Sequence, residues 1–129
     1  MLSKGFRDEE NEKAGQVLTG LLEENFEPDL WRKQQREKVS KILEELSGIG
    51  ISELYDISPD VLLLKLQEQE FTAAQYEQLG DLLFNISRVE PEHHLELSAH
   101  AVALYEHSQI QSKTFSFSLI EKINSAKNA

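Results

Sequence analysis

The sequence FTAAQYEQLGDLLFNIS, at residues 71–87, contains the clearest helix signal in the chain. Thr72 and Gln75 have the spacing of a capping box, and Phe71 and Tyr76 flank this box at the positions of a hydrophobic staple. Apolar residues then recur every three or four positions, at Tyr76, Leu79, Leu82, Leu83 and Ile86, which places them on one side of a helix. The pattern predicts a helix that begins after Thr72 and runs to about Ser87.

Five other segments have helical patterns, which gives about six helices in total. They cover residues 7–25, 29–47, 61–66 and 91–107, and a last segment that begins at Ser116 or Ser118 and ends near Ala126. Pro28, Pro59 and Pro91 each stand just ahead of one of them, where the missing N–H of proline costs nothing. Ser58 is the expected N-cap of the short third segment, and Gly48 and Gly50 end the second. Residues 49–57 are predicted to be a packed connector that inserts Ile51, Leu54 and Tyr55 into the core.

The same patterns predict which apolar residues are buried. Residues 61–66 are apolar nearly all round, so we expect a deeply buried helix there. The last helix is expected to bury five apolar side chains, those of Phe115, Phe117, Leu119, Ile120 and Ile123. Trp31 is expected in the core, with an exposed interface position as the alternative.

Composition agrees with an all-α fold in one domain. The 129 residues include 19 Leu and 18 Glu but only 8 Val and Thr together, and straight-chain residues lose less rotamer freedom in a helix than β-branched ones. The balance of 40% hydrophobic and 28% charged residues is that of an ordinary globular domain. We expect one domain over residues 1–129, with residues 1–6 and 127–129 mobile.

Charge and cysteine content exclude several classes of function. The formal net charge is −10, with most of the excess between residues 48 and 106, which disfavours nucleic acids and anionic membranes as partners. The chain has no cysteine, so a disulfide framework, a thiolate zinc site and a cysteine nucleophile are excluded. The longest apolar runs are too short to span a membrane, and residues 1–20 lack the apolar core of a signal peptide. A cytoplasmic protein without a cofactor is the expectation.

Two helices carry a pattern that is similar to a known repeat. Tyr76-x-x-Leu79-Gly80-x-x-Leu83 has the spacing of the first helix of a tetratricopeptide repeat, and Ala101-x-x-x-Tyr105 resembles the small and aromatic positions of the second. Ser108 stands where the repeat has alanine, and the link between the helices is about two turns longer. The resemblance implies antiparallel helix pairs stacked in a right-handed, tetratricopeptide-like array.

Residues 40–127 also look like a group of uncharacterised bacterial all-helical proteins with a degenerate repeat of this kind. The similarity rests on the strings Ser58-Pro59-Asp60, Gly80-Asp81-Leu82-Leu83 and Lys113-Thr114-Phe115-Ser116-Phe117. It implies a fold and no activity.

The first functional hypothesis is a non-catalytic interaction module. Its partner would be either a protein segment laid along a helix groove or another copy of the chain. The groove is expected between the helices that begin at Thr72 and Pro91, with Tyr76, Asp81, His94 and Tyr105 as contact residues. Apolar burial would supply the affinity, and the acidic rim would set the orientation.

The alternative hypothesis is a metal-binding helical protein. His93, Glu96 and His100 form a row on one predicted helix, and Glu96 with His100 has the i, i+4 spacing that lets two side chains share an ion. His93 and His100 are about 10 Å apart along an ideal helix, so a further ligand such as Asp81 or Glu77 would be needed.

Two other chemical patterns are weaker. Arg32, Lys33, Arg36, Lys38 and Lys41 form a basic row beside Trp31 that could bind phosphate, but glutamates interleave with it, as on an ordinary solvated helix. The chain has no glycine-rich phosphate loop, no Gly-x-Ser-x-Gly elbow and no His-Glu-x-x-His pair. We therefore expect no enzymatic activity.

Overall fold

The computed structural model describes the backbone of residues 2–129 and the side chains of residues 12–129. All regular secondary structure in this part of the chain is helical, which confirms the all-α prediction. The helices are α1 (Leu2–Glu23), α2 (Pro28–Leu30), α3 (Arg36–Ser47), α4 (Ile51–Leu54), α5 (Pro59–Gln67), α6 (Ala73–Val89), α7 (His94–Ser112) and α8 (Phe117–Lys127). Residues 1–6 were expected to be mobile. Met1 and the side chains of residues 2–6 lie outside the described residues, so this expectation stays a prediction.

The capping signals read from the sequence are confirmed. Thr72 Oγ1 accepts from the Gln75 backbone N–H at 3.2 Å, and the Gln75 side chain accepts from the Thr72 N–H at 2.9 Å. Ser58 caps α5 by accepting from Val61, and Ser116 caps α8 by accepting from Leu119. These bonds satisfy backbone donors that a helix start leaves without an internal partner, so local sequence alone sets three of the helix starts.

The helix predicted over residues 29–47 is interrupted at its start by a π-helical turn. Trp31–Gln35 form this turn between α2 and α3, and the Arg36 N–H bonds the Trp31 carbonyl, five residues back. Gly48 then ends α3 with a left-handed φ of 76°, which costs glycine no steric strain. The wider π turn is a local departure from ideal periodicity that the apolar pattern did not reveal.

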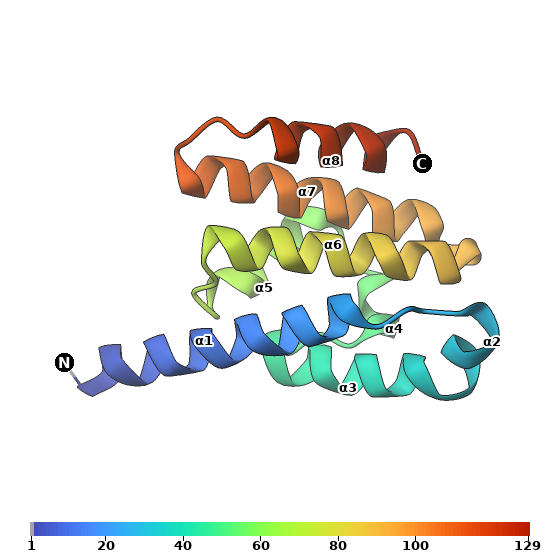
Figure 1. Cartoon of the computed structure of the whole chain (residues 1–129), viewed down its shortest axis with the longest axis horizontal. Helices are drawn as coiled ribbons and strands as arrows, with labels where there is room; N and C mark the ends of the chain where they lie inside the picture. Colours follow the sequence, from blue (N-terminus) through green and yellow to red (C-terminus); the bar gives the residue numbers. More distant parts are fainter. Residues whose placement is uncertain (1) are drawn as a thin grey trace.

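The longer helices stack in a layered row. Figure 1 shows α8, α7, α6 and α1 lying one after another, with α3 beyond α1 and with α4 and α5 behind. The strongest packing is between the antiparallel helices α6 and α7, and α8 packs on α7 while α1 packs on α6. Gln78 Nε2 donates to Thr19 Oγ1 at 2.9 Å and thereby ties α6 to α1.

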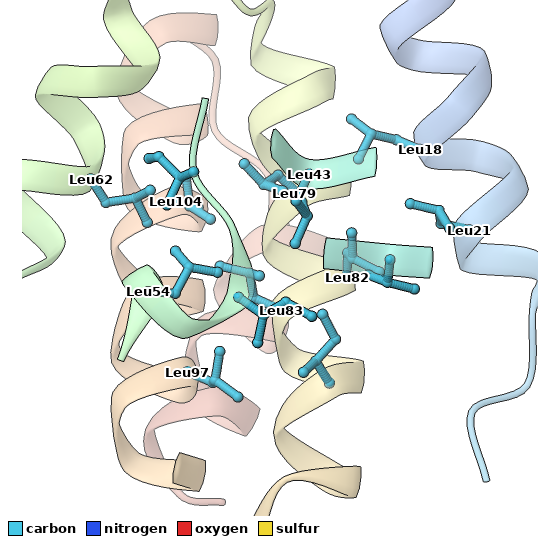
Figure 2. Close-up of a cluster of buried hydrophobic side chains, with 14 of the residues drawn as sticks. Leu18, Leu21, Leu43, Leu54, Leu62, Leu79, Leu82, Leu83, Leu97 and Leu104 are labelled. Atoms are coloured by element: carbon cyan, nitrogen blue, oxygen red, sulfur yellow. The ribbon is translucent and has the colours of Figure 1, made fainter. Parts of the chain in front are cut away.

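The main core lies where most of these helices meet. Figure 2 shows leucines from α1, α3, α4, α5, α6 and α7 converging, among them Leu18, Leu43, Leu54, Leu83 and Leu104. The connector at residues 49–57 buries Ile51 and Leu54 in this core, as predicted. A second, smaller cluster joins α7 to α8 through Ala101, Tyr105, Leu119 and Ala126. Burial of these apolar side chains is the main favourable term in folding.

The helices α6 and α7 approach most closely at Gly80. A Cβ added to Gly80 would lie only 2.7 Å from Cε1 and 2.9 Å from Cδ1 of the Tyr105 ring. Gly15 and Gly20 in α1 have no such neighbour, because added Cβ atoms there meet ordinary van der Waals distances or open space. Close packing therefore explains the glycine in α6 and does not explain those in α1.

Two predictions about burial are wrong. α5 buries Leu62 and Leu66, but Leu64 on its other side is 64% exposed, because α5 packs mainly against α7 and leaves its outer face to solvent. Phe115 and Phe117 are exposed, because they stand on either side of the N-cap Ser116. Leu119 is the one fully buried residue of the five predicted there.

Trp31 is buried, as expected. In the part of the chain that the structure describes, no helix is both long enough and apolar enough to cross a membrane.

Candidate functional site

The structure brings two of the predicted contact residues together. The Tyr105 hydroxyl on α7 donates to Asp81 Oδ1 on α6 at 2.7 Å. Lys122 of α8 donates to Asp81 Oδ2 at 3.0 Å and to Glu77 Oε2 at 2.6 Å, and its Nζ lies 6.0 Å from the centre of the Tyr105 ring. This network joins three helices, so it fastens α8 to the α6–α7 pair.

The pKa values of Tyr105 and Lys122 in this network are both raised above their ordinary values. Burial raises the pKa of Tyr105 far above its ordinary value, and the bond to the Asp81 carboxylate raises it further. Burial lowers the pKa of Lys122, but the hydrogen bonds that Lys122 donates to Glu77 and Asp81 outweigh this effect and raise the pKa overall. Near neutral pH the tyrosine is therefore neutral and the lysine charged, which suits a structural tie and gives no group poised for proton transfer.

The other two predicted contact residues lie elsewhere. Tyr76 is buried, with its ring 5.9 Å from that of Phe71 and 4.5 Å from that of His107, both in edge-on contact. His94 is half-buried, with Nδ1 3.4 Å from the Ser87 carbonyl oxygen. The space between α6 and α7 is thus filled by the protein's own side chains, and Tyr76 and Tyr105 have almost no surface to offer a partner.

The row His93, Glu96 and His100 is divided between surface and core. His100 is 1% exposed, and its Nε2 lies 2.7 Å from the Leu54 carbonyl oxygen, to which it donates when the proton is on Nε2. Burial lowers the pKa of His100, although the bond to Leu54 acts in the opposite direction. The His93 ring stacks on Tyr55 with 3.6 Å between centroids, and its Nδ1 lies 3.9 Å from Glu96 Oε2.

The predicted pairing of Glu96 with His100 around a metal ion stays a prediction, and the two side chains lie in different surroundings. Glu96 is exposed, while the Nε2 atom of His100 is occupied by a backbone oxygen inside the protein. Among the described residues, no three histidine, aspartate or glutamate side chains are grouped so that they could hold a metal ion.

Among the residues whose side chains the structure describes, the most exposed aromatic residues lie where α7 meets α8. Phe115 and Phe117 are 68% and 75% exposed, and their rings contact each other edge-on with 4.8 Å between centroids. Ile110, in the last turn of α7, is 72% exposed. We call Ile110, Phe115 and Phe117 the apolar corner, which Figure 1 places at the end of the molecule where the chain turns from α7 into α8. Large apolar residues gathered on a surface mark contact sites.

The backbone of the apolar corner is held in place by hydrogen bonds. Lys113 ends α7 with a left-handed φ of 58°, and its N–H bonds the Ile110 carbonyl at 3.3 Å. The Gln109 side chain donates to the Thr114 carbonyl, and the Ser112 hydroxyl donates to the Gln109 carbonyl at 3.0 Å. The link is therefore ordered before any partner binds, which reduces the entropy that binding would cost.

The apolar corner also differs from the rest of the protein in charge. Residues 107–120 contain no aspartate or glutamate, and Lys113 is their one lysine or arginine. The whole chain has 23 acidic and 13 basic residues, and most of the acidic excess lies between residues 48 and 106, outside this stretch. This run without acidic residues is visible in the sequence. Its position on the surface was not predicted, because Phe115 and Phe117 were expected to be buried.

Comparisons with known proteins do not supply a function: no family model, no curated protein and no solved structure matches the chain.

Proposed function

We propose that the protein is a non-catalytic interaction module that associates with a second copy of itself through the apolar corner. The observation that carries the proposal is the pair of exposed, mutually packed rings of Phe115 and Phe117 on an ordered link. Aromatic residues are enriched at protein interfaces, and two pre-positioned rings bury apolar area at little entropic cost.

Charge favours another copy of this chain as the occupant. Two molecules of net charge −10 repel each other over most approach directions. A contact from corner to corner brings together residues 107–120 of each copy, a stretch of 14 residues that contributes no carboxylate side chain. A two-fold contact of this kind is isologous, which is the commonest symmetry of soluble oligomers.

The size of the apolar corner predicts weak association. A fully exposed phenylalanine offers about 150–250 Å², so two phenylalanines and one isoleucine at the observed exposure offer roughly 400 Å² per copy. A corner-to-corner contact would bury roughly 800 Å² in total, against about 1,200–2,000 Å² in stable complexes. We therefore expect a dissociation constant in the range from about 0.1 to 1 mM, where transient contacts lie.

We also propose that the helices stack as a degenerate tetratricopeptide-like array. Support comes from α6, in which Tyr76, Leu79 and Leu83 face the core at the positions of the repeat pattern. The tight approach of Gly80 to the Tyr105 ring supports the same interpretation, because the repeat requires a small residue where its two helices meet.

Sedimentation equilibrium tests the proposed self-association. The average mass of the wild-type protein should rise with concentration up to about 1 mM, and it should rise further at higher salt, because salt screens the repulsion between acidic molecules. The double variant Phe115→Ala/Phe117→Ala should remain monomeric. Leu95→Ala is the matched control, because Leu95 is also highly exposed but lies at the other end of α7.

Each outcome bears on the proposal. A wild-type protein that stays monomeric at both salt concentrations refutes self-association. A dimer that persists in the double variant, or that disappears in Leu95→Ala, refutes the assignment of the contact to the apolar corner.

A further inference from the structure

We propose a second site, at the opposite end of the molecule, that binds a small molecule through a phosphate or carboxylate oxyanion. The site is a hollow of about 350 Å³ that is lined by residues of the π turn, the start of α3 and the end of α6. Its lining comes from Pro28, Arg32, Arg36, Arg88, Val89, Glu90, Pro91 and Glu92. We call it the arginine hollow. Its volume is at the lower end of the range for small-molecule sites.

The distribution of arginine is the first argument for this site. The chain has four arginines, and three of them, Arg32, Arg36 and Arg88, line this one hollow although the protein is strongly acidic. Two come from the π turn and α3, and the third comes from α6, more than 50 positions later in the sequence. Arginine presents a planar fork of N–H donors that matches phosphate and carboxylate groups, whereas lysine offers a point charge.

Arg36 is paired with a carboxylate that Trp31 also holds. Arg36 Nε lies 3.0 Å from Glu90 Oε1 in an ion pair, Trp31 Nε1 donates to the same oxygen at 2.7 Å, and the Glu90 side chain is only 16% exposed. This ion pair orients the guanidinium, and Arg36 has no second ion pair among the residues whose side chains the structure describes. Supporting partners of this kind orient the groups that bind a ligand.

Tyr55 adds to this network. Its hydroxyl is buried and has no hydrogen bond of good geometry within the described part of the chain. Burial raises the pKa of Tyr55, while the neighbouring Arg36 lowers it and Glu90 raises it, which places the hydroxyl beside that ion pair. A buried hydroxyl next to a positioned guanidinium is a further donor that could turn toward a bound oxyanion.

Arg32 and Arg88 supply charge that the protein itself does not neutralise. Neither forms an ion pair with any residue whose side chain the structure describes. The Arg88 guanidinium lies over the Phe84 ring, with Cζ 4.7 Å from the ring centre. A cation over a ring face is attracted by the negative charge of that face, which helps to hold the Arg88 side chain in place.

The local backbone is a further feature of the site. The π turn at Trp31–Gln35 contains Trp31, which bonds Glu90, and Arg32, which lines the hollow. Single π turns inside α-helices often occur at functional sites, because the wider turn is less stable than a regular one. Glu92 also lines the hollow, so the net charge remains moderate, which favours a small oxyanion over a polyanion such as nucleic acid.

Fluorescence of Trp31 tests the proposal, because Trp31 is the only tryptophan in the chain and bonds Glu90 in the wall of the site. Pyrophosphate and succinate, titrated separately at constant ionic strength, represent the phosphate and the carboxylate source. We expect a saturable change with one or both, weakened at least about tenfold in Arg32→Gln and in Arg88→Gln. Lys41→Gln is the matched control, because Lys41 is an exposed cation on α3 outside the hollow.

Each result of the titration either assigns the ligand group or overturns the proposal. Saturation by pyrophosphate alone assigns phosphate as the ligand group, and saturation by succinate alone assigns carboxylate. A response that matches an equal ionic strength of NaCl, or that weakens equally in Lys41→Gln, overturns the proposal. Circular dichroism of each variant verifies folding, which the two arginine replacements should preserve because both side chains are exposed and without ion pairs in the described structure.

Discussion

Replacing Gly80 with alanine gives a quantitative test of the contact between α6 and α7. The new methyl group would lie 2.7 Å from Tyr105 Cε1, and the ring cannot swing away because it is buried and bonded to Asp81. Overpacking of a core costs about 1–3 kcal/mol, while the better helix propensity of alanine returns about 1 kcal/mol. The expected net effect is a loss of up to about 2 kcal/mol.

Gly20→Ala is the internal control, because an added Cβ there meets nothing within 4 Å. It should stabilise the protein by up to about 1 kcal/mol through helix propensity alone. The difference between the two variants therefore isolates the steric term, about 1–3 kcal/mol. Urea unfolding followed by circular dichroism measures both free energies. If Gly80→Ala proves as stable as Gly20→Ala, the account of the α6–α7 contact is refuted.

Three other changes probe the interior. Trp31→Phe should lower the free energy of unfolding by about 1–3 kcal/mol, because it removes the indole N–H that bonds the Glu90 carboxylate, and urea unfolding with no loss would contradict this. Burial lowers the pKa of His100 below its ordinary 6.5, so its contribution to stability is fully present above pH 6.5 and is lost as the pH falls toward the lowered value. Unfolding measured from pH 7.5 to 5 should show this loss in the wild type and less of it in His100→Gln. Lys122→Met should speed hydrogen exchange in α8 and leave exchange in α3 unchanged, and equal acceleration in both helices would count against the tie.

The helical architecture was predictable because its signals are local. The Thr72 and Gln75 capping box, the Ser58 cap and the leucine spacing each involve residues within about two turns of one another, so no tertiary information is needed to recognise them. The same holds for the left-handed end of α3 at Gly48.

The candidate sites were less predictable because their contacts join distant parts of the chain. The Trp31–Glu90 bond spans 59 positions and the His100–Leu54 bond spans 46, and nothing in the helical periodicity indicates either pairing. Two errors have one cause: periodicity shows that residues are apolar, but only the packing of neighbouring helices decides which apolar residues are covered. Phe117 and Leu64 are exposed for that reason.

Tyr105 was predicted to be a contact residue in a groove between the helices that begin at Thr72 and Pro91. Its hydroxyl instead finds a partner in Asp81, which lets the whole side chain be buried. Of the four predicted contact residues, Asp81 and Tyr105 meet each other, while Tyr76 and His94 serve other parts of the structure.

Paramagnetic relaxation between two copies would test the corner-to-corner contact most directly. The chain has no cysteine, so Lys113→Cys provides a single attachment point for a nitroxide label at the apolar corner. Mixed with unlabelled, ¹⁵N-enriched wild type, this protein should broaden the amide signals of residues 110–117 and leave those of α3 unaffected. Broadening spread evenly over the surface, or none at a concentration near 1 mM, would contradict the proposed association.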